Sequence, residues 1–218
     1  MTRTWSVQGE GSAQEPIAKI RRQRRRRART VAAHGVAALG LSLILIGGGS
    51  LAAPAVTGTT VANLYAQEKS NWCWVAVSKT VINHYKATSP SQCSVYKWGK
   101  AASSCTANTV GSFYTDVDRA LKGGGIGNRG TAETGTNILM SAFRGEVDAK
   151  RVMLIRWGWL STNLQTGHMI AIGGYNTTTN QVQVVNPAGS GSKVWKDRGW
   201  VMNDGSHKTT HLRWYIQG

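Results

Sequence analysis

The apolar residues predict an α+β protein, in which a helical half packs on an antiparallel β-sheet half. Three segments before residue 150 carry apolar residues at helical spacing, whereas the segments after residue 150 alternate in polarity or form short apolar runs. Helices therefore come first and strands follow, which is typical of α+β proteins. The chain has 218 residues, of which 41% are hydrophobic and nine are Trp, a composition that excludes a disordered chain.

The first predicted helix covers residues 72–86. Ser70 or Asn71, just before it, is of a type suited to capping a helix N-terminus. Four large side chains of the segment are spaced so that they share one helical face. They are Trp74, Val77, Val81 and Tyr85.

Two more helices are predicted, over residues 113–122 and 136–147. In the first of them, apolar residues again recur at helical spacing. The segments between the helices, 87–112 and 123–135, are rich in small and polar residues. We therefore expect these two segments to be loops.

Strands are predicted over residues 151–157, 168–175 and 181–186. The last two flank the polar segment 176–180, and this pattern is typical of a β-hairpin. Shorter strand candidates follow, at residues 193–195, 200–202 and 212–216.

The N-terminal region has the pattern of a secretory signal peptide. An arginine cluster at residues 21–29 precedes a segment, 30–67, that lacks Asp, Glu, Lys and Arg. The segment contains a compact apolar run at residues 36–46, and Ala53-Pro54-Ala55 supplies small residues for cleavage. We predict a signal peptide over residues 1–55, because cleavage after Ala53 would place a proline next to the cut.

Cleavage there predicts a secreted, extracellular protein. Residues 56–66 would form a short N-terminal segment and residues 67–218 the functional domain. The alternative is an uncleaved membrane anchor, since the apolar segment is long enough to span a bilayer. The glycines and the short apolar core of this segment favour cleavage. Contact with a membrane is expected only if the segment stays attached.

The formal net charge of +16 indicates which kinds of partner the protein could bind. A basic surface attracts polyanions, so an anionic cell-wall or surface polymer is one candidate partner. Much of the basic charge lies in residues 1–55, which hold nine Lys and Arg and two acidic residues. No basic stripe at helical spacing is present in the rest of the chain, and we expect no specific nucleic-acid binding.

The three cysteines predict one disulfide and one free thiol. An exported protein meets an oxidising compartment, in which paired cysteines persist. Cys93 and Cys105 flank one short segment, whereas Cys73 would begin the first predicted helix. A bridge between Cys73 and Cys93 would require the chain to fold back along that helix, over about 20 Å. We therefore expect Cys93 to pair with Cys105 and Cys73 to stay free.

Cys73, His168 and Asn186 form a candidate catalytic set. The start of a helix favours an anion, and hence a reactive thiolate. His84 lies about 16 Å along the same helix and is out of reach of Cys73. His168 begins a strongly apolar predicted strand, and Asn186 ends the next one. The hairpin makes them cross-strand neighbours, so the Asn side chain would orient the imidazole.

Three motifs in this chain resemble those of papain-like cysteine peptidases. The first is Gln67-Glu-Lys-Ser-Asn-Trp-Cys73-Trp74, with a Gln six residues before the Cys. The second is Gly167-His168 followed by an apolar strand that ends in Gly-Gly-Tyr, and the third is Asn186. The Asn-Trp-Cys-Trp core and Ser91-Gln92-Cys93 are most similar to the bacterial avirulence-type subgroup of secreted effectors.

The resemblance implies a papain-like fold and a role for each matching residue. Cys73 would attack an acyl carbon, and His168 would act first as its base and then as the acid for the leaving group. Asn186 would orient His168. The side chain of Gln67 and the backbone N–H of Cys73 would form the oxyanion hole. The expected function is an endopeptidase that acts on proteins or peptides through a thioester acyl-enzyme.

The chain departs from papain itself after Asn186, where Pro187-Ala188 replaces Ser-Trp. The tryptophan that shields the Asn–His pair is therefore missing at this place, and Trp195 is the candidate to replace it. Only residues 56–66 separate the predicted cleavage site from Gln67, too few for a papain-type inhibitory propeptide.

Other functions are compatible with the same motifs, because the motifs specify the nucleophile and not the acyl donor. An amidase, a transglutaminase-like enzyme or a cell-wall peptide hydrolase is one alternative. A non-catalytic module that binds a wall polymer is another. The cysteine and histidine spacing matches no zinc motif, and the literal G-x-G-x-x-G at residues 125–130 follows a predicted helix, not a strand. We expect no metal and no cofactor.

Overall fold

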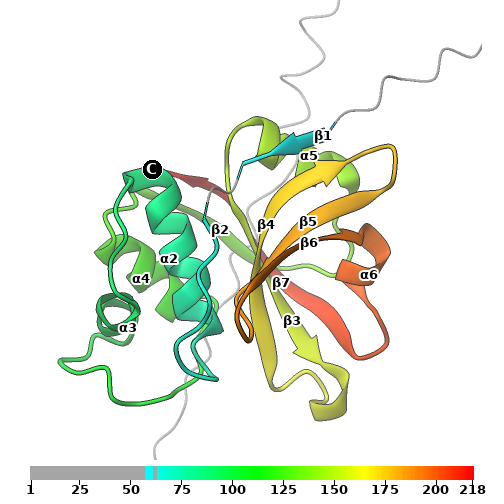
Figure 1. Ribbon diagram of the computed structural model, residues 1–218. Coiled ribbons are helices and arrows are strands. Elements are labelled where there is room, and N and C mark those ends of the chain that lie inside the picture. Colours follow the sequence, from blue (N-terminus) through cyan, green and yellow to red (C-terminus); the bar gives the residue numbers. More distant parts are fainter. Residues whose placement is uncertain (1–56, 61–62) are drawn as a thin grey trace, which may run out of the picture. The chain divides into compact units, whose positions relative to one another are not determined.

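The computed structural model describes residues 57–60 and 63–218. The predicted signal peptide, residues 1–55, lies outside the described residues. The described part of the chain is an α+β domain with an antiparallel sheet, as the sequence predicts at this coarse level (Figure 1). Within this part, no helix has both the length and the apolar character needed to cross a membrane.

Within the described residues the sheet has seven strands, and every neighbouring pair is antiparallel. The order is β2-β7-β3-β4-β5-β6, and the short strand β1 pairs with β4 outside this sequence. The long central strands are buried and carry mostly apolar residues. The strands are β1 (Thr57–Thr59), β2 (Asn128–Thr134), β3 (Met153–Trp159), β4 (Gly167–Asn176), β5 (Gln181–Asn186), β6 (Ser192–Asp197) and β7 (His207–Gln217).

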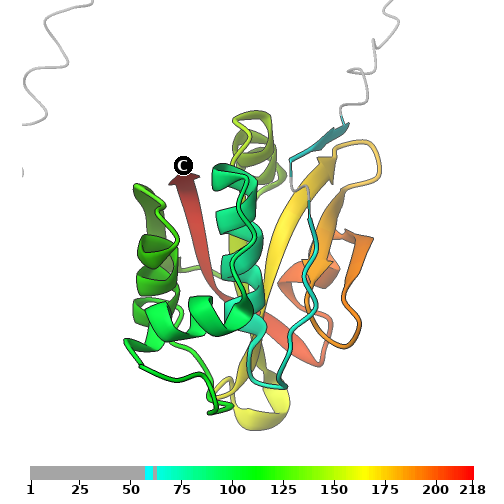
Figure 2. The same ribbon diagram turned by 60° about the vertical axis from the view of Figure 1, so that its left-hand side comes forward.

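Three helices cover one face of the sheet (Figures 1 and 2). They are α2 (Cys73–Lys86), α3 (Gln92–Lys100) and α4 (Thr115–Gly123). Their apolar side chains pack with Leu154 of β3 and with Met169 and Ala171 of β4 in one core cluster. Helix α2 is buried along most of its length, and it packs directly against β4, the strand that carries His168.

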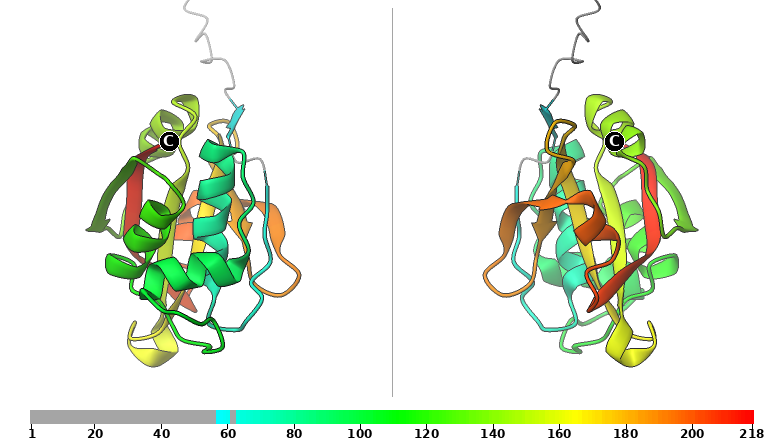
Figure 3. Two further views of the ribbon diagram at one scale, coloured as in Figure 1. Left: turned by 90° about the vertical axis from the view of Figure 1, so that its left-hand side faces the viewer. Right: turned by 90° about the vertical axis from the view of Figure 1, so that its right-hand side faces the viewer.

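The other face of the sheet packs against α5 (Met140–Asp148) and α6 (Arg198–Met202), and Figure 3 shows α6 from this side. Successive residues of a strand point to opposite faces. Ile155 of β3 accordingly belongs to this second cluster, whereas its neighbour Leu154 belongs to the first. The central strands are apolar on both faces because both faces are covered.

The structure corrects three predicted segments. Residues 87–112 contain helix α3, which begins where the Ser91 side chain accepts a hydrogen bond from the backbone N–H of Ser94. Residues 123–135 contain β2, whose polar residues pair with β7 at the edge of the sheet. Residues 200–202 belong to helix α6, not to a strand, because the Asp197 side chain caps a short helix there.

The predicted N-cap of the first helix is also wrong. Trp72 precedes α2, and no side chain caps the helix start. Ser70 and Asn71 instead use their side chains to contact Asn108. The remaining predicted elements are confirmed within a few residues at their ends.

Leu154 provides a test of the packing between α2 and the sheet. Its side chain is fully buried between the helices and the strands, whereas Leu160 is 41% exposed. We expect Leu154→Ala to lower the free energy of unfolding by about 2–5 kcal/mol, since the cavity it leaves would not refill. The matched Leu160→Ala should lower it by less than about 1 kcal/mol. Urea denaturation measures both, and equal effects would contradict the described core.

Candidate active site

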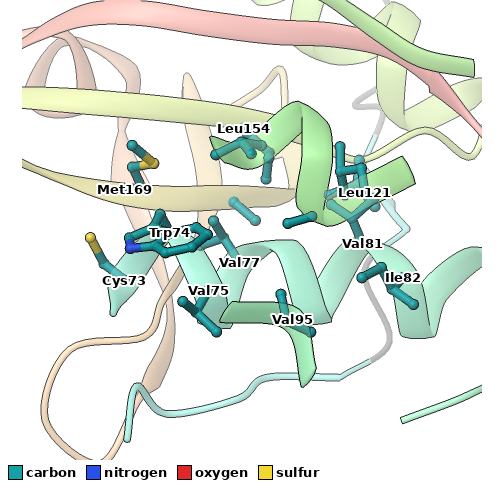
Figure 4. Close-up of a cluster of buried hydrophobic side chains, with 14 of the residues drawn as sticks. Cys73, Trp74, Val75, Val77, Val81, Ile82, Val95, Leu121, Leu154 and Met169 are labelled. Atoms are coloured by element: carbon teal, nitrogen blue, oxygen red, sulfur yellow. The ribbon is translucent and has the colours of Figure 1, made fainter. Parts of the chain in front are cut away.

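Cys73 is the first residue of α2 and lines a cavity of about 510 Å³. Figure 4 shows its side chain at the start of the helix, near Met169 of β4. The thiol is free, as the sequence predicts, and it is buried. A backbone hydrogen bond from Met169 reaches the sulfur, so the nucleophile candidate lies beside the residue that follows His168.

Residues 105–110 contact Lys69 and the two tryptophans next to Cys73, and they hold this part of the chain in place. The ammonium group of Lys69 donates to the carbonyl oxygens of Cys105 and Thr106, at 2.7 and 2.8 Å. The indole N–H of Trp72 donates to the carbonyl of Ala107, and that of Trp74 to the carbonyl of Thr109. The two tryptophans that flank Cys73 are thus fixed by the same segment.

A disulfide anchors this segment to α3. Cys93 and Cys105 are bonded, with their Cα atoms 5.2 Å apart, which confirms the predicted pairing. Cys93 lies in the first turn of α3, and Cys105 begins the segment that contacts Lys69 and Trp72. The disulfide therefore supports the position of Cys73 from a distance.

His168 and Asn186 are hydrogen-bonded, as expected for residues of one hairpin, although they meet diagonally, because the register that pairs Ala171 with Val185 offsets them by two residues. The distance from Nε2 of His168 to Oδ1 of Asn186 is 2.7 Å. The same Oδ1 accepts a hydrogen bond from the backbone N–H of Ala188 at 2.9 Å, which identifies it as the oxygen of the amide. Because an amide oxygen only accepts, Nε2 of His168 must carry the proton. The neutral ring therefore has its basic lone pair on Nδ1.

Two tryptophans of β3 flank the His168 ring. Trp159 stacks on it with ring centroids 6.3 Å apart, and Trp157 lies at 6.1 Å. Trp195, which the sequence suggests as the shield, pairs instead with Gln183 in the β5–β6 ladder and is 36% exposed. The proposed shielding by Trp195 is therefore wrong. The sequence alone did not indicate Trp159, because only the pairing of β3 with β4 brings this residue close to His168.

Gln67 lines the same cavity as Cys73 and His168. Its Nε2 donates to the carbonyl oxygens of Lys69 and Ser70, at 3.0 and 2.6 Å. Its Oε1 is buried and has no hydrogen-bond partner among the described residues. Both amide hydrogens thus face backbone carbonyls, and donation to a substrate oxygen would require one of these bonds to be exchanged.

The thiol and the imidazole are both held in their neutral forms. Burial raises the pKa of Cys73, although backbone hydrogen bonds from Met169, Trp74 and Cys73 itself favour the thiolate. Burial also lowers the pKa of His168, against the opposing effect of the Asn186 hydrogen bond. The helix start therefore stabilises the anion as the sequence argument says, but desolvation reverses the net direction of the shift.

The other histidines of the described region do not line this cavity. His84 bonds the carbonyl of Lys150 at the far end of α2. His207 is buried, and its Nδ1 lies 2.9 Å from the Asp204 carboxylate. His211 pairs with Arg156 across β3 and β7. Of these four histidines, His168 is therefore the one positioned to act on Cys73.

The wall of the cavity also holds Arg156, which the sequence analysis did not single out. The sequence does contain an indication of its importance, because Arg156 is the one charged residue within the apolar strand β3. Among the described residues, no cluster of three or more His, Cys, Asp or Glu side chains is placed to bind a metal ion. A comparison of the chain with models of protein families, and a search of curated proteins, found no match.

The disulfide provides a test of the support behind Cys73. We expect the double variant Cys93→Ala/Cys105→Ala to lose about 2–3 kcal/mol of unfolding free energy, because the unfolded chain regains the entropy of a short loop. The fluorescence of Trp72 and Trp74 should also shift toward that of solvated indole. Denaturation followed by fluorescence measures both effects. An unchanged stability would contradict the supporting role.

Proposed function

We propose that this protein is a secreted, papain-like thiol hydrolase, and that it acts as an endopeptidase on proteins or peptides. The observation that carries the proposal is the His168–Asn186 hydrogen bond, at the wall of a cavity that Cys73 also lines. A nucleophile, a base and an orienting group in this relation are typical of acyl transfer at cysteine. The motifs around Gln67, Cys73 and His168 support the same class.

The proposed reaction begins from the neutral pair. As the sulfur of Cys73 attacks the acyl carbon of the substrate, its proton passes to Nδ1 of His168. Asn186 keeps the ring in the required tautomer and stabilises the imidazolium that forms. Trp159, which stacks on the same ring, helps to hold the orientation of the imidazole.

The oxyanion of the tetrahedral intermediate would accept hydrogen bonds from the backbone N–H of Cys73 and from Nε2 of Gln67. The N–H of Cys73 lies in the first turn of α2, where helical N–H groups have no partner within the helix. Collapse of the intermediate breaks the C–N bond, and His168 returns its proton to the leaving amine. Water then attacks the thioester with His168 as base, which releases the acid and restores the thiol.

The first test removes two members of the proposed triad, the nucleophile and the base. We expect Cys73→Ser to abolish cleavage, and His168→Gln to lower kcat by at least about 10²-fold, since the base is lost. The matched control is His84→Gln, at a histidine of α2 outside the cavity, which should retain wild-type activity. Mass spectrometry of a peptide library measures cleavage, and an active Cys73→Ser variant would refute the assignment.

The acyl donor is tested with the same proteins. Casein and purified peptidoglycan are incubated separately with the wild type and with Cys73→Ser. Release of peptides from casein supports the endopeptidase, whereas release of fragments from peptidoglycan alone would identify a cell-wall peptide hydrolase. Binding to peptidoglycan without Cys73-dependent cleavage of either material would indicate a non-catalytic module.

The neutral pair also predicts the pH profile. Activity needs His168 unprotonated, and burial lowers the pKa of this histidine below its ordinary value of 6.5. We therefore expect kcat/KM to rise with pH through a limb centred below 6.5. Because burial raises the pKa of Cys73, the proton that is transferred is retained into the alkaline range. Initial rates across the pH range measure the limb, and a midpoint at or above 6.5 would contradict the described burial.

A further inference from the structure

We propose that Arg156 binds a carboxylate of the substrate beside the acyl group that Cys73 attacks. The inference rests on the proposed function and specifies its substrate class. It begins with the position of Arg156, which pairs with Met169 in the β3–β4 ladder. Cross-strand partners lie on the same face of a sheet, so Arg156 and Met169 share the face that packs against α2.

The guanidinium group lies next to the proposed reacting groups. It borders Gly167, where an added Cβ would lie only 3.2 Å from Cζ of Arg156, and Gly167 directly precedes His168. The positive charge of Arg156 also acts on Cys73, favouring its thiolate. A substrate group that contacts Arg156 would therefore lie close to the attacked acyl carbon.

The charge of Arg156 has no anionic partner in the described part of the chain. Its Nη1 donates to the hydroxyl of Thr210 at 2.8 Å, and its Nη2 donates to the carbonyls of Leu164 and Gln165 at 3.1 and 3.3 Å. All three acceptors are neutral. Among the described cavity-lining residues, Arg156 is also the only one that is charged at neutral pH, since His168 is held neutral.

The hydrogen bonds of Arg156 leave it suited to bind an anion. A guanidinium has five N–H donors, and three hydrogen bonds to protein acceptors are formed. They fix the plane of the group between β7 and the segment that precedes β4, so little conformational freedom is lost when a ligand binds. Nε of Arg156 forms none of these bonds, and it is not among the fully buried unpartnered atoms of the described residues. Since Arg156 also lines the cavity, this donor is available to a ligand there. A carboxylate is the anion that a peptide substrate supplies, on an Asp or Glu side chain or at its C-terminus.

The first experiment requires no peptidase activity. Cys73 is alkylated with iodoacetate, which carries a carboxylate, and with the neutral iodoacetamide of similar size. In both reactions the sulfur displaces iodide, an S–C bond forms as the C–I bond breaks, and the thiol proton passes to His168 or to solvent. The ratio of the two rates measures the preference for an anion at the site.

We expect Arg156→Gln to lower the iodoacetate-to-iodoacetamide ratio about 10-fold or more, the effect of one charge-assisted hydrogen bond. Arg156→Lys should retain part of the preference because the charge remains. The control Arg119→Gln removes an exposed arginine of α4 and should leave the ratio unchanged. A purely structural role would slow both reagents alike in Arg156→Gln and Arg156→Lys. An unchanged ratio in Arg156→Gln would overturn the proposal.

A second experiment distinguishes the two sources of the carboxylate. Peptides that the wild type cleaves are compared in pairs, with Glu or Gln near the scissile bond, and with a free or an amidated C-terminus. A loss of preference in Arg156→Gln for the first pair identifies an acidic side chain, and for the second pair a terminal carboxylate. If neither preference exists while Cys73→Ser is inactive, the proposed function stands and the inference fails. If no peptide is cleaved, the alkylation ratio alone decides the inference.

Discussion

The burial of Trp74 is the constraint on which the position of the candidate nucleophile depends. Its indole ring is fully buried, and an added Cβ at either Gly99 or Gly111 would collide with it. Only glycine leaves room for the ring at these two places. Because Cys73 precedes Trp74 on the same turn of α2, the place of the ring determines where the thiol meets β4. Helix α3 and the segment up to Gly111 are thus both arranged around one side chain.

Desolvation at this junction also determines the chemistry that the site supports. The backbone N–H groups at the start of α2 favour the thiolate of Cys73, but burial favours the thiol more strongly. Burial likewise keeps His168 neutral. Under the proposed function, a neutral thiol and a neutral imidazole in one cavity require that the proton moves during the attack, and not before it.

The supports of the site come from widely separated parts of the chain. The disulfide in α3 holds residues 105–110, which contact both tryptophans beside Cys73. Strand β3 supplies Trp159 against His168 and Arg156 within the cavity wall. The hairpin of β4 and β5 supplies the His168–Asn186 bond. The site is therefore a property of the whole domain, although its proposed reacting groups lie in short motifs.

The sequence by itself determined the α+β class, most of the elements and the free thiol at a helix start. It also indicated that His168 and Asn186 lie close together, because a short hairpin places their strands side by side. The ladder shifts at a bulge in β4, and only the structure shows that the two side chains meet diagonally, two residues out of register. Only the tertiary structure decided the net pKa shift of Cys73, since desolvation depends on what packs around the thiol. The pairing of β3 with β4, also visible only in the structure, places Trp159 against His168 and Arg156 in the cavity wall. Such pairings join residues far apart in the chain, and local periodicity contains no information about them.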